Sequence, residues 1–163
     1  MNKGILWGVG LVAILLVLWY GFSSYLGGMD GDNAGTTWLD GETSFELGDV
    51  EYGGGLVTTT LALTNSADEA VTIEDIFSNC GCTSAVINHG PHTIGPFGMP
   101  GHDDLATVGT LDWSILPGDE FTAKVTFDPA AHGESSIGES VERKVTIETD
   151  KGSGEITFTA HIV

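Results

Sequence analysis

Six residues of kinds that bind soft metal ions lie close together in the middle of this chain. They are Cys80, Cys82, His89, His92, Met99 and His102. Thiolates two residues apart can face the same metal ion, and thiolate, imidazole and thioether together suit copper. Without the methionine, the same set suits zinc. One hypothesis is therefore a copper or zinc site, although the spacing matches no zinc-finger pattern.

The same two cysteines can also pair with each other. They are the only cysteines in the chain, and an oxidising compartment permits a disulfide between Cys80 and Cys82. Such a bond closes a very small ring, whose tight geometry makes it easier to reduce. His89 and His102 are then solvated loop residues, and the cysteines form either a structural bridge or a pair that exchanges with other thiols. The residues alone leave these alternatives open.

The sequence lacks the patterns of several common enzymes. It has no Gly-x-Ser-x-Gly motif, which would place a serine nucleophile at a sharp elbow. The glycines at 53–55 lack the lysine and the following helix of a phosphate-binding loop. An acidic neighbourhood is expected around Cys80, and it disfavours the thiolate that a cysteine nucleophile needs. We expect no catalytic activity.

The charge of the chain limits its partners. The formal net charge is -18, and all 23 Asp and Glu residues lie at or beyond Asp30. Nucleic-acid binding requires a basic face that displaces counterions from phosphates, so this class of function is excluded. Cationic partners, divalent metals and a high-salt environment all remain compatible with the acidity.

The N-terminal segment is predicted to cross a membrane. Residues 4–22 (GILWGVGLVAILLVLWYGF) contain no charged side chain. A helix of that length, rising 1.5 Å per residue, approaches the roughly 30 Å thickness of the hydrocarbon layer. Lys3 precedes the segment and acidic residues follow it, so the positive-inside rule places the N-terminus in the cytoplasm. Residues 1–26 are thus read as a short cytoplasmic end and a single-pass anchor in the lipid bilayer, with a cleaved signal peptide as the alternative.

The rest of the chain reads as a tether and a β domain. Residues 27–44 are rich in Gly, Asp and Thr without apolar periodicity, which is typical of a flexible tether. From residue 45 onward, short runs such as 57–64 and 121–127 alternate apolar with polar residues. About seven such runs separated by turn residues predict an all-β, antiparallel β-sandwich over residues 45–163. Residues 88–110, which hold the histidines and Met99, are expected to form an inserted loop.

A family resemblance agrees with this pattern. The chain contains LTNSADEAVTIEDIFSNCGCTSA, then LPGDEFTAKVTFDP, Gly133, VTIETD and EITFTAHIV. This succession over residues 45–163 resembles the bacterial family called domain of unknown function 1573, with its Thr-Asn turn, Cys-Gly-Cys-Thr turn, Pro-Gly turn and Phe-Asp-Pro strand end. The resemblance implies an immunoglobulin-like β-sandwich that is exported or membrane-anchored, and it implies no established activity. Residues 88–110 are longer than the family's usual connection.

These observations predict a membrane-anchored, extracytoplasmic binding or assembly module without catalytic activity. Sheet edges and end loops of such sandwiches recruit partner chains, here an envelope protein. The prediction rests partly on analogy of fold. The alternative is a copper or zinc binding protein at the membrane surface, which uses the Cys-Gly-Cys turn and the His/Met loop.

Overall fold

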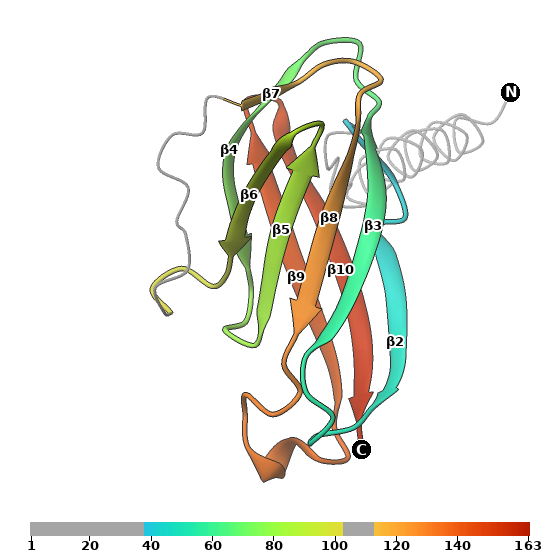
Figure 1. Ribbon diagram of the computed structural model, residues 1–163, viewed down its shortest axis with the longest axis vertical. Coiled ribbons are helices and arrows are strands. Elements are labelled where there is room, and N and C mark those ends of the chain that lie inside the picture. Colours follow the sequence, from blue (N-terminus) through green and yellow to red (C-terminus); the bar gives the residue numbers. More distant parts are fainter. Residues whose placement is uncertain (1–37, 103–112) are drawn as a thin grey trace, which may run out of the picture. The chain divides into compact units, whose positions relative to one another are not determined.

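The computed structural model describes residues 38–102 and 113–163, which lie within the second of the two units into which the chain divides, Gly35–Val163. In this described part, the chain forms two five-stranded β-sheets and one short 3₁₀-helix, η1 (Glu134–Ser136). The first sheet has the strand order β1 (Leu39–Gly41), β3 (Val57–Asn65), β8 (Glu120–Phe127), β5 (Thr83–His89) and β6 (His92–Phe97). The second has the order β2 (Ser44–Val50), β10 (Gly152–Ile162), β9 (Ser140–Thr149), β4 (Val71–Ser78) and β7 (Trp113–Ile115). The predicted all-β fold is confirmed (Figure 1).

Alternation of side chains along the strands builds the core between the sheets. Successive side chains of a strand point to opposite faces, so one apolar set per strand faces the other sheet. In β8 and β10 every second residue is buried, as the sequence predicts. Phe158 of β10 is fully buried and packs against Phe45 and Phe127, with ring centroids 5.3 and 5.6 Å apart. Burial of each such ring contributes about 1.5–3 kcal/mol.

The strand pairing departs from a purely antiparallel sandwich at one point. β1 pairs antiparallel with β3 in the first sheet, whereas β2, which follows it, pairs parallel with β10 in the second. The chain therefore passes from one sheet to the other between Gly41 and Ser44. This crossing lets β2 run beside the C-terminal strand in the same direction.

The folded domain begins earlier than the predicted tether allows. Trp38 is 2% exposed, stacks on Phe121 at 6.3 Å, and its carbonyl accepts a hydrogen bond from the Ser66 N–H. Gly154 makes room for this ring, because an added Cβ there would lie 3.0 Å from Trp38 and 2.7 Å from Leu39. Residues 38–44 thus belong to the sandwich. A three-residue strand is too short to show the alternation by which strands are recognised.

The predicted inserted loop also contains regular structure. β5 ends at His89 and β6 begins at His92, so the first part of residues 88–110 is a β-hairpin. Its Gly90, Pro91, Gly95 and Pro96 concealed the strand pattern, because glycine and proline are typical of turns. Residues 103–110 of the insertion lie outside the described residues.

The predicted membrane anchor, residues 4–22, also lies outside the described residues, as do residues 27–37 of the predicted tether. Within residues 38–102 and 113–163, no helix is long and apolar enough to span a bilayer.

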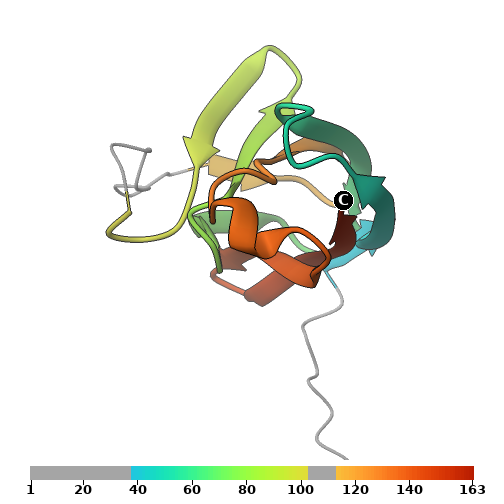
Figure 2. The same ribbon diagram turned by 90° about the horizontal axis from the view of Figure 1, so that it is seen from below.

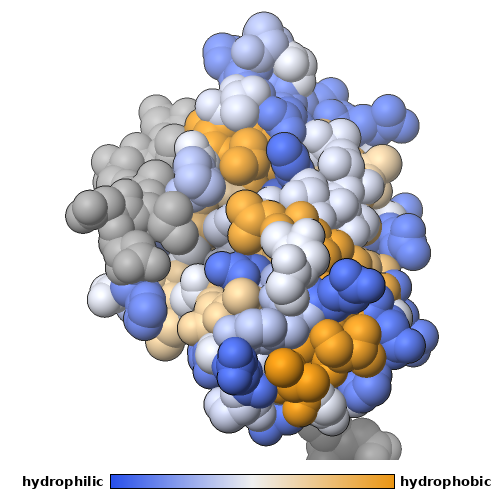
Figure 3. Space-filling model, turned by 60° about the horizontal axis from the view of Figure 1, so that its bottom comes forward, coloured by the Kyte–Doolittle hydropathy of each residue, from blue (hydrophilic) through white to orange (hydrophobic). Residues whose placement is uncertain are grey.

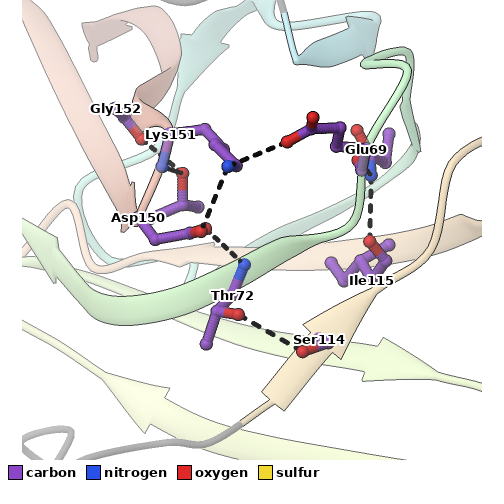
Figure 4. A network of polar contacts seen from close by, with 9 residues as sticks. Glu69, Thr72, Ser114, Ile115, Asp150, Lys151 and Gly152 are labelled. Carbon is purple, nitrogen blue, oxygen red and sulfur yellow. Dashed lines mark hydrogen bonds and ion pairs between the residues drawn. The ribbon is translucent and has the colours of Figure 1, made fainter.

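A polar network links β4, β7 and the β9–β10 turn at one end of the sandwich (Figure 4). The Lys151 ammonium lies 3.0 Å from a Glu69 carboxylate oxygen and 3.7 Å from one of Asp150. Asp150 also accepts the Thr72 N–H at 2.8 Å, and the Thr72 and Ser114 hydroxyls are 3.3 Å apart. The hydrogen bond to Glu69 is the main cause that raises the pKa of Lys151 above its ordinary value. The ion pairs are exposed, so they add little stability.

Candidate functional site at the Cys80–Cys82 turn

Cys80 and Cys82 lie in the turn from β4 to β5, where the chain crosses between the two sheets. Backbone and hydroxyl hydrogen bonds hold this turn. The Ser78 hydroxyl donates to the carbonyl oxygens of Cys80 and Thr83 at 2.7 and 2.8 Å. The Thr83 N–H donates to the Cys80 carbonyl at 3.1 Å, and the Asp128 N–H donates to the Cys82 carbonyl at 2.8 Å. These hydrogen bonds of the turn do not involve the cysteine side chains.

The two cysteines are joined in a disulfide, and their exposed fractions are 8% for Cys80 and 4% for Cys82. The sequence left this pairing as one of several alternatives. A bridge between residues two positions apart constrains only a very short stretch of the unfolded chain. The chain-entropy model gives such a ring on the order of 1–2 kcal/mol, against about 3 kcal/mol for a 15-residue loop. The bond is therefore a weak structural brace.

Two basic side chains contact the two sulfur atoms. Nε2 of His132 lies 3.2 Å from Sγ of Cys80, and Nε–H of Arg143 donates to Sγ of Cys82 at 3.1 Å. The Cys82 backbone N–H also donates to Sγ of Cys80, at 3.1 Å. The sequence predicted acidic neighbours for Cys80, whereas the side chains that contact the two sulfur atoms are basic. The reason is that His132 and Arg143, far away along the chain, are brought to the turn by the fold.

His132 is held by the loop between β8 and β9. This loop starts at Asp128, whose carboxylate accepts the Ala130 N–H at 2.9 Å, and it continues through turns into η1. Seen from below in Figure 2, the loop and η1 (orange) lie beside the β4–β5 turn (green) at the same end of the sandwich. His132 was not among the six residues predicted to form the site, since it follows Cys80 by 52 residues.

Arg143 reaches Cys82 from β9 and is the only arginine of the chain. Its Nη1 donates to the Glu142 carbonyl at 2.8 Å, which fixes the guanidinium over the sulfur. Partial burial lowers the pKa of Arg143 from its ordinary value, and the nearby Glu139 carboxylate partly offsets this. An arginine stays charged at neutral pH in proteins, so a positive charge lies beside Cys82.

The six residues predicted to bind a metal do not come together. His89 is at the opposite end of β5 from the cysteines, where it lies 3.2 Å from Asp119 and its ring is tilted by 57° against that of Trp113. His92 faces His89 across the β5–β6 hairpin. The seven residues of β5 separate this pair from the disulfide, a distance of roughly 20 Å at about 3.3 Å per residue.

Met99 and His102 follow β6, and only His102 is shown to be near the cysteines. A Cβ added to Gly81 would lie 2.8 Å from Nδ1 of His102, so the imidazole packs directly on the turn. The Met99 side chain is exposed. Within the described residues, the ligand atoms that converge are those of Cys80, Cys82 and His132, within 4.8 Å of one another.

The disulfide bears directly on metal binding. A sulfur atom in a disulfide is not a thiolate, so this group can accept a soft metal ion only after reduction. Copper or zinc binding stays a prediction, and elemental analysis of the reduced protein is the measurement that tests it.

The fold and the turn together define the chain as a β-sandwich of two five-stranded sheets that carries a Cys-Gly-Cys disulfide turn. A family model described as "Protein of unknown function (DUF1573)" matches residues 40–98, a stretch that includes Asn65 and the Cys-Gly-Cys turn. This match supports the resemblance found in the sequence. In a search of the curated proteins, none matches.

The chain is also similar to solved structures. A protein of unknown function from Porphyromonas gingivalis W83 has a TM-score of 0.52 and 13% identity, over 76% of this chain and 46% of that one. The secreted serine protease VesC from Vibrio cholerae has a TM-score of 0.48 and 12% identity, over 76% of this chain and 23% of that one. The chain therefore spans less than half the length of either protein. At this identity, the likeness to the first shows the β-sandwich fold alone.

Proposed function

We propose that this chain is an extracytoplasmic binding or assembly module, and not an enzyme, that is held at a membrane by residues 4–22. In this proposal, it binds an extended segment of an envelope protein partner, which adds as a strand to the outer edge of β2. The free edge of β2 is the observation that carries the proposal. Backbone hydrogen bonds supply affinity in this mode of binding, and the side chains of alternate residues supply specificity.

β2 is the outer strand best suited to accept a partner. In the described part of the chain, the outer strands of the sheets are β1, β6, β2 and β7. β1 and β7 have three residues each, and β6 contains Pro96, which lacks an N–H donor. β2 has seven residues and no proline, and along one side it pairs with β10. Figure 1 shows β2 at the margin of the sandwich.

One hydrogen bond shows to which side the backbone N–H and C=O groups of β2 point. The Thr157 N–H of β10 donates to the Thr43 carbonyl at 2.8 Å, so the backbone groups of residue 43 face β10. Successive residues of a strand direct these groups to alternate sides. Those of Phe45 and Leu47 therefore also face β10, and those of Ser44 and Glu46 face outward. An added strand would bond at Ser44 and Glu46, and Glu46 lies further from the end of β2.

Side chains on β2 indicate the chemistry of the partner. Phe45 and Leu47 are half-buried because no further strand covers them, and Glu46 is exposed. An added strand that alternates apolar with basic residues would cover the first two and neutralise the third. The net charge of -18 favours such a cationic partner. On the face shown in Figure 3, apolar patches (orange) are interrupted by hydrophilic surface, which favours recognition at an edge over a broad apolar contact.

Peptide selection on the full-length chain in detergent micelles tests the proposal. We expect selected peptides from a random library to alternate apolar and basic residues, and to increase hydrogen-exchange protection at the Glu46 amide. Glu46→Pro removes one of the two outward donors at Ser44 and Glu46 without removing a bond to β10, so it should weaken binding strongly. Glu46→Ala, which also lacks the charge but keeps the N–H, should weaken binding less. Selected peptides that bind the proline variant as well as the alanine variant would refute strand addition at β2.

The anchor has its own test. We expect the chain to stay in the membrane fraction after extraction at alkaline pH, because residues 4–22 match the thickness of the bilayer. Release of the intact chain into the supernatant would contradict a membrane-spanning anchor.

A further inference from the structure

We propose that the Cys80–Cys82 disulfide exchanges with a dithiol of a partner molecule, which becomes oxidised while two thiols remain at the turn. This reaction is stoichiometric, with one dithiol for each disulfide. It does not depend on strand addition at β2. The geometry around the two sulfur atoms is the ground for the proposal.

The position of the disulfide favours a role in thiol exchange over a role in stabilising the fold. Hydrogen bonds from Ser78, Thr83 and Asp128 hold the turn, and all of them can persist when the sulfur–sulfur bond is broken. The ring formed by residues two positions apart also constrains very little chain. Loss of the bond therefore leaves the turn ready to form it again.

The surroundings of the sulfurs are basic in a strongly acidic protein. Net charge is -18, yet the only arginine contacts Sγ of Cys82, an imidazole contacts Sγ of Cys80, and a second imidazole packs on Gly81. A neutral disulfide gains little from the Arg143 cation, whereas a thiolate is stabilised by a nearby cation and by hydrogen-bond donors. This arrangement fits the thiolates that form when the bond opens.

Exposure indicates which sulfur is attacked. Both cysteines are buried, but Cys80 is the more exposed of the two, at 8% against 4%, and its neighbour His132 is itself exposed. Cys82 is covered by Arg143 and lies 3.6 Å from the Thr83 hydroxyl. An incoming thiolate therefore reaches Sγ of Cys80, and Cys82 is the leaving group.

The first step forms a mixed disulfide. One thiolate of the dithiol bonds to Sγ of Cys80, the Cys80–Cys82 bond breaks, and its electron pair stays on Cys82. The Arg143 Nε–H, 3.1 Å from that sulfur, donates a charge-assisted hydrogen bond to the new thiolate. Better stabilisation of the leaving thiolate makes the exchange faster.

The second step releases the product. The other thiolate of the dithiol attacks its partner sulfur in the mixed disulfide, and Cys80 leaves as a thiolate beside His132 and the Cys82 N–H. The dithiol has lost two electrons and two protons. The cysteines have gained two electrons, and their thiolates take up two protons, so atoms, charge and electrons balance.

The test measures the rate at which dithiothreitol reduces the disulfide of the full-length chain. Samples are quenched with iodoacetamide, and mass spectrometry measures the fraction of chains whose cysteines are alkylated. We expect Arg143→Gln to slow the exchange roughly tenfold, the effect of one charge-assisted hydrogen bond. Arg143→Lys keeps the charge and should recover part of the rate. His132→Gln should slow the exchange by roughly three- to tenfold, because it removes the imidazole from Cys80.

Matched variants separate this effect from damage to the fold. Lys144→Gln removes the next cation of β9, which pairs with Glu155 at 2.8 Å, and His92→Gln removes an exposed imidazole at the far end of β5. Both should exchange at the rate of the unchanged chain. Thermal unfolding of every variant shows whether the fold is retained.

A reduced two-cysteine peptide tests transfer to a partner. We expect one equivalent of oxidised peptide for each chain whose Cys80 and Cys82 become alkylated. Exchange that occurs only at the rate of global unfolding would overturn the proposal and leave a structural bridge. Equal rates for Arg143→Gln and Lys144→Gln would also overturn it.

Discussion

Replacement of Trp38 by alanine is expected to lower the free energy of unfolding by about 3–5 kcal/mol, the usual loss when a buried tryptophan is truncated. The indole is 2% exposed and stacks on Phe121 at 6.3 Å, and Gly154 is shaped to receive it. Its removal leaves a cavity between the start of the domain and the first sheet. Urea denaturation of the full-length chain, followed by fluorescence and circular dichroism, measures the loss.

Trp113→Ala provides the matched control, since Trp113 is half-buried on the short outer strand β7. We expect its effect to be clearly smaller than that of Trp38→Ala. Equal stability of the Trp38→Ala variant and the unchanged chain would mean that residues 38–44 do not belong to the fold. The tether would then extend to residue 44, as the sequence suggested.

Replacement of Asn65 by alanine is the second change with a large expected effect, a loss of about 2–4 kcal/mol. The side chain is fully buried at the end of β3. Its Nδ2 donates to the carbonyls of Ile115 and Glu69 at 2.9 and 3.1 Å, and its Oδ1 accepts the Ala67 N–H at 3.0 Å. Alanine leaves these backbone groups without the partner, and a buried group without one costs about 1–3 kcal/mol.

Asn88→Ala is the control for this prediction. The Asn88 amide bonds to the Thr122 and Thr93 hydroxyls near the surface of β5, where water can replace it. We expect a loss below about 1 kcal/mol. Equilibrium unfolding in urea compares the two variants. Similar losses for both would contradict the central role of Asn65.

The buried Asn65 also explains two motifs of the family resemblance. The Thr-Asn turn and the Pro-Gly turn meet at one end of the sandwich, because the Gly118 N–H donates to the Asn65 carbonyl at 2.8 Å. At the other end, the Cys-Gly-Cys turn meets the Phe-Asp-Pro strand end, because the Asp128 N–H donates to the Cys82 carbonyl at 2.8 Å. The motifs are thus pairs of turns that close the two ends.

The sequence by itself determined the strands that bury one face. The alternation of apolar and polar residues is sufficient to predict β3, β8 and β10. A strand in a sheet that packs against a second sheet must present an apolar side to it. The short β1 and the hairpin β5–β6 were not predicted. β1 has three residues, and glycine and proline interrupt the hairpin, so that neither shows a period.

The candidate site was visible in the sequence as its two cysteines and His102, whose imidazole packs on Gly81. Because they are two residues apart, the two cysteines were predicted to act together, either as ligands of one metal ion or as a disulfide. His89 and His92 were grouped with them because they are near in sequence, but β5 is an extended strand and carries them to its other end. Nearness along the chain is a poor guide where a strand intervenes.

Only the tertiary structure decided which side chains surround the sulfurs. His132 comes from the loop after β8 and Arg143 from β9, respectively 52 residues after Cys80 and 61 after Cys82. No periodicity links residues at such separations, because their proximity depends on the pairing of strands across the sheets and on hydrogen bonds within a loop. The sequence therefore showed the cysteine pair, whereas only the fold showed that His132 and Arg143 contact its two sulfur atoms.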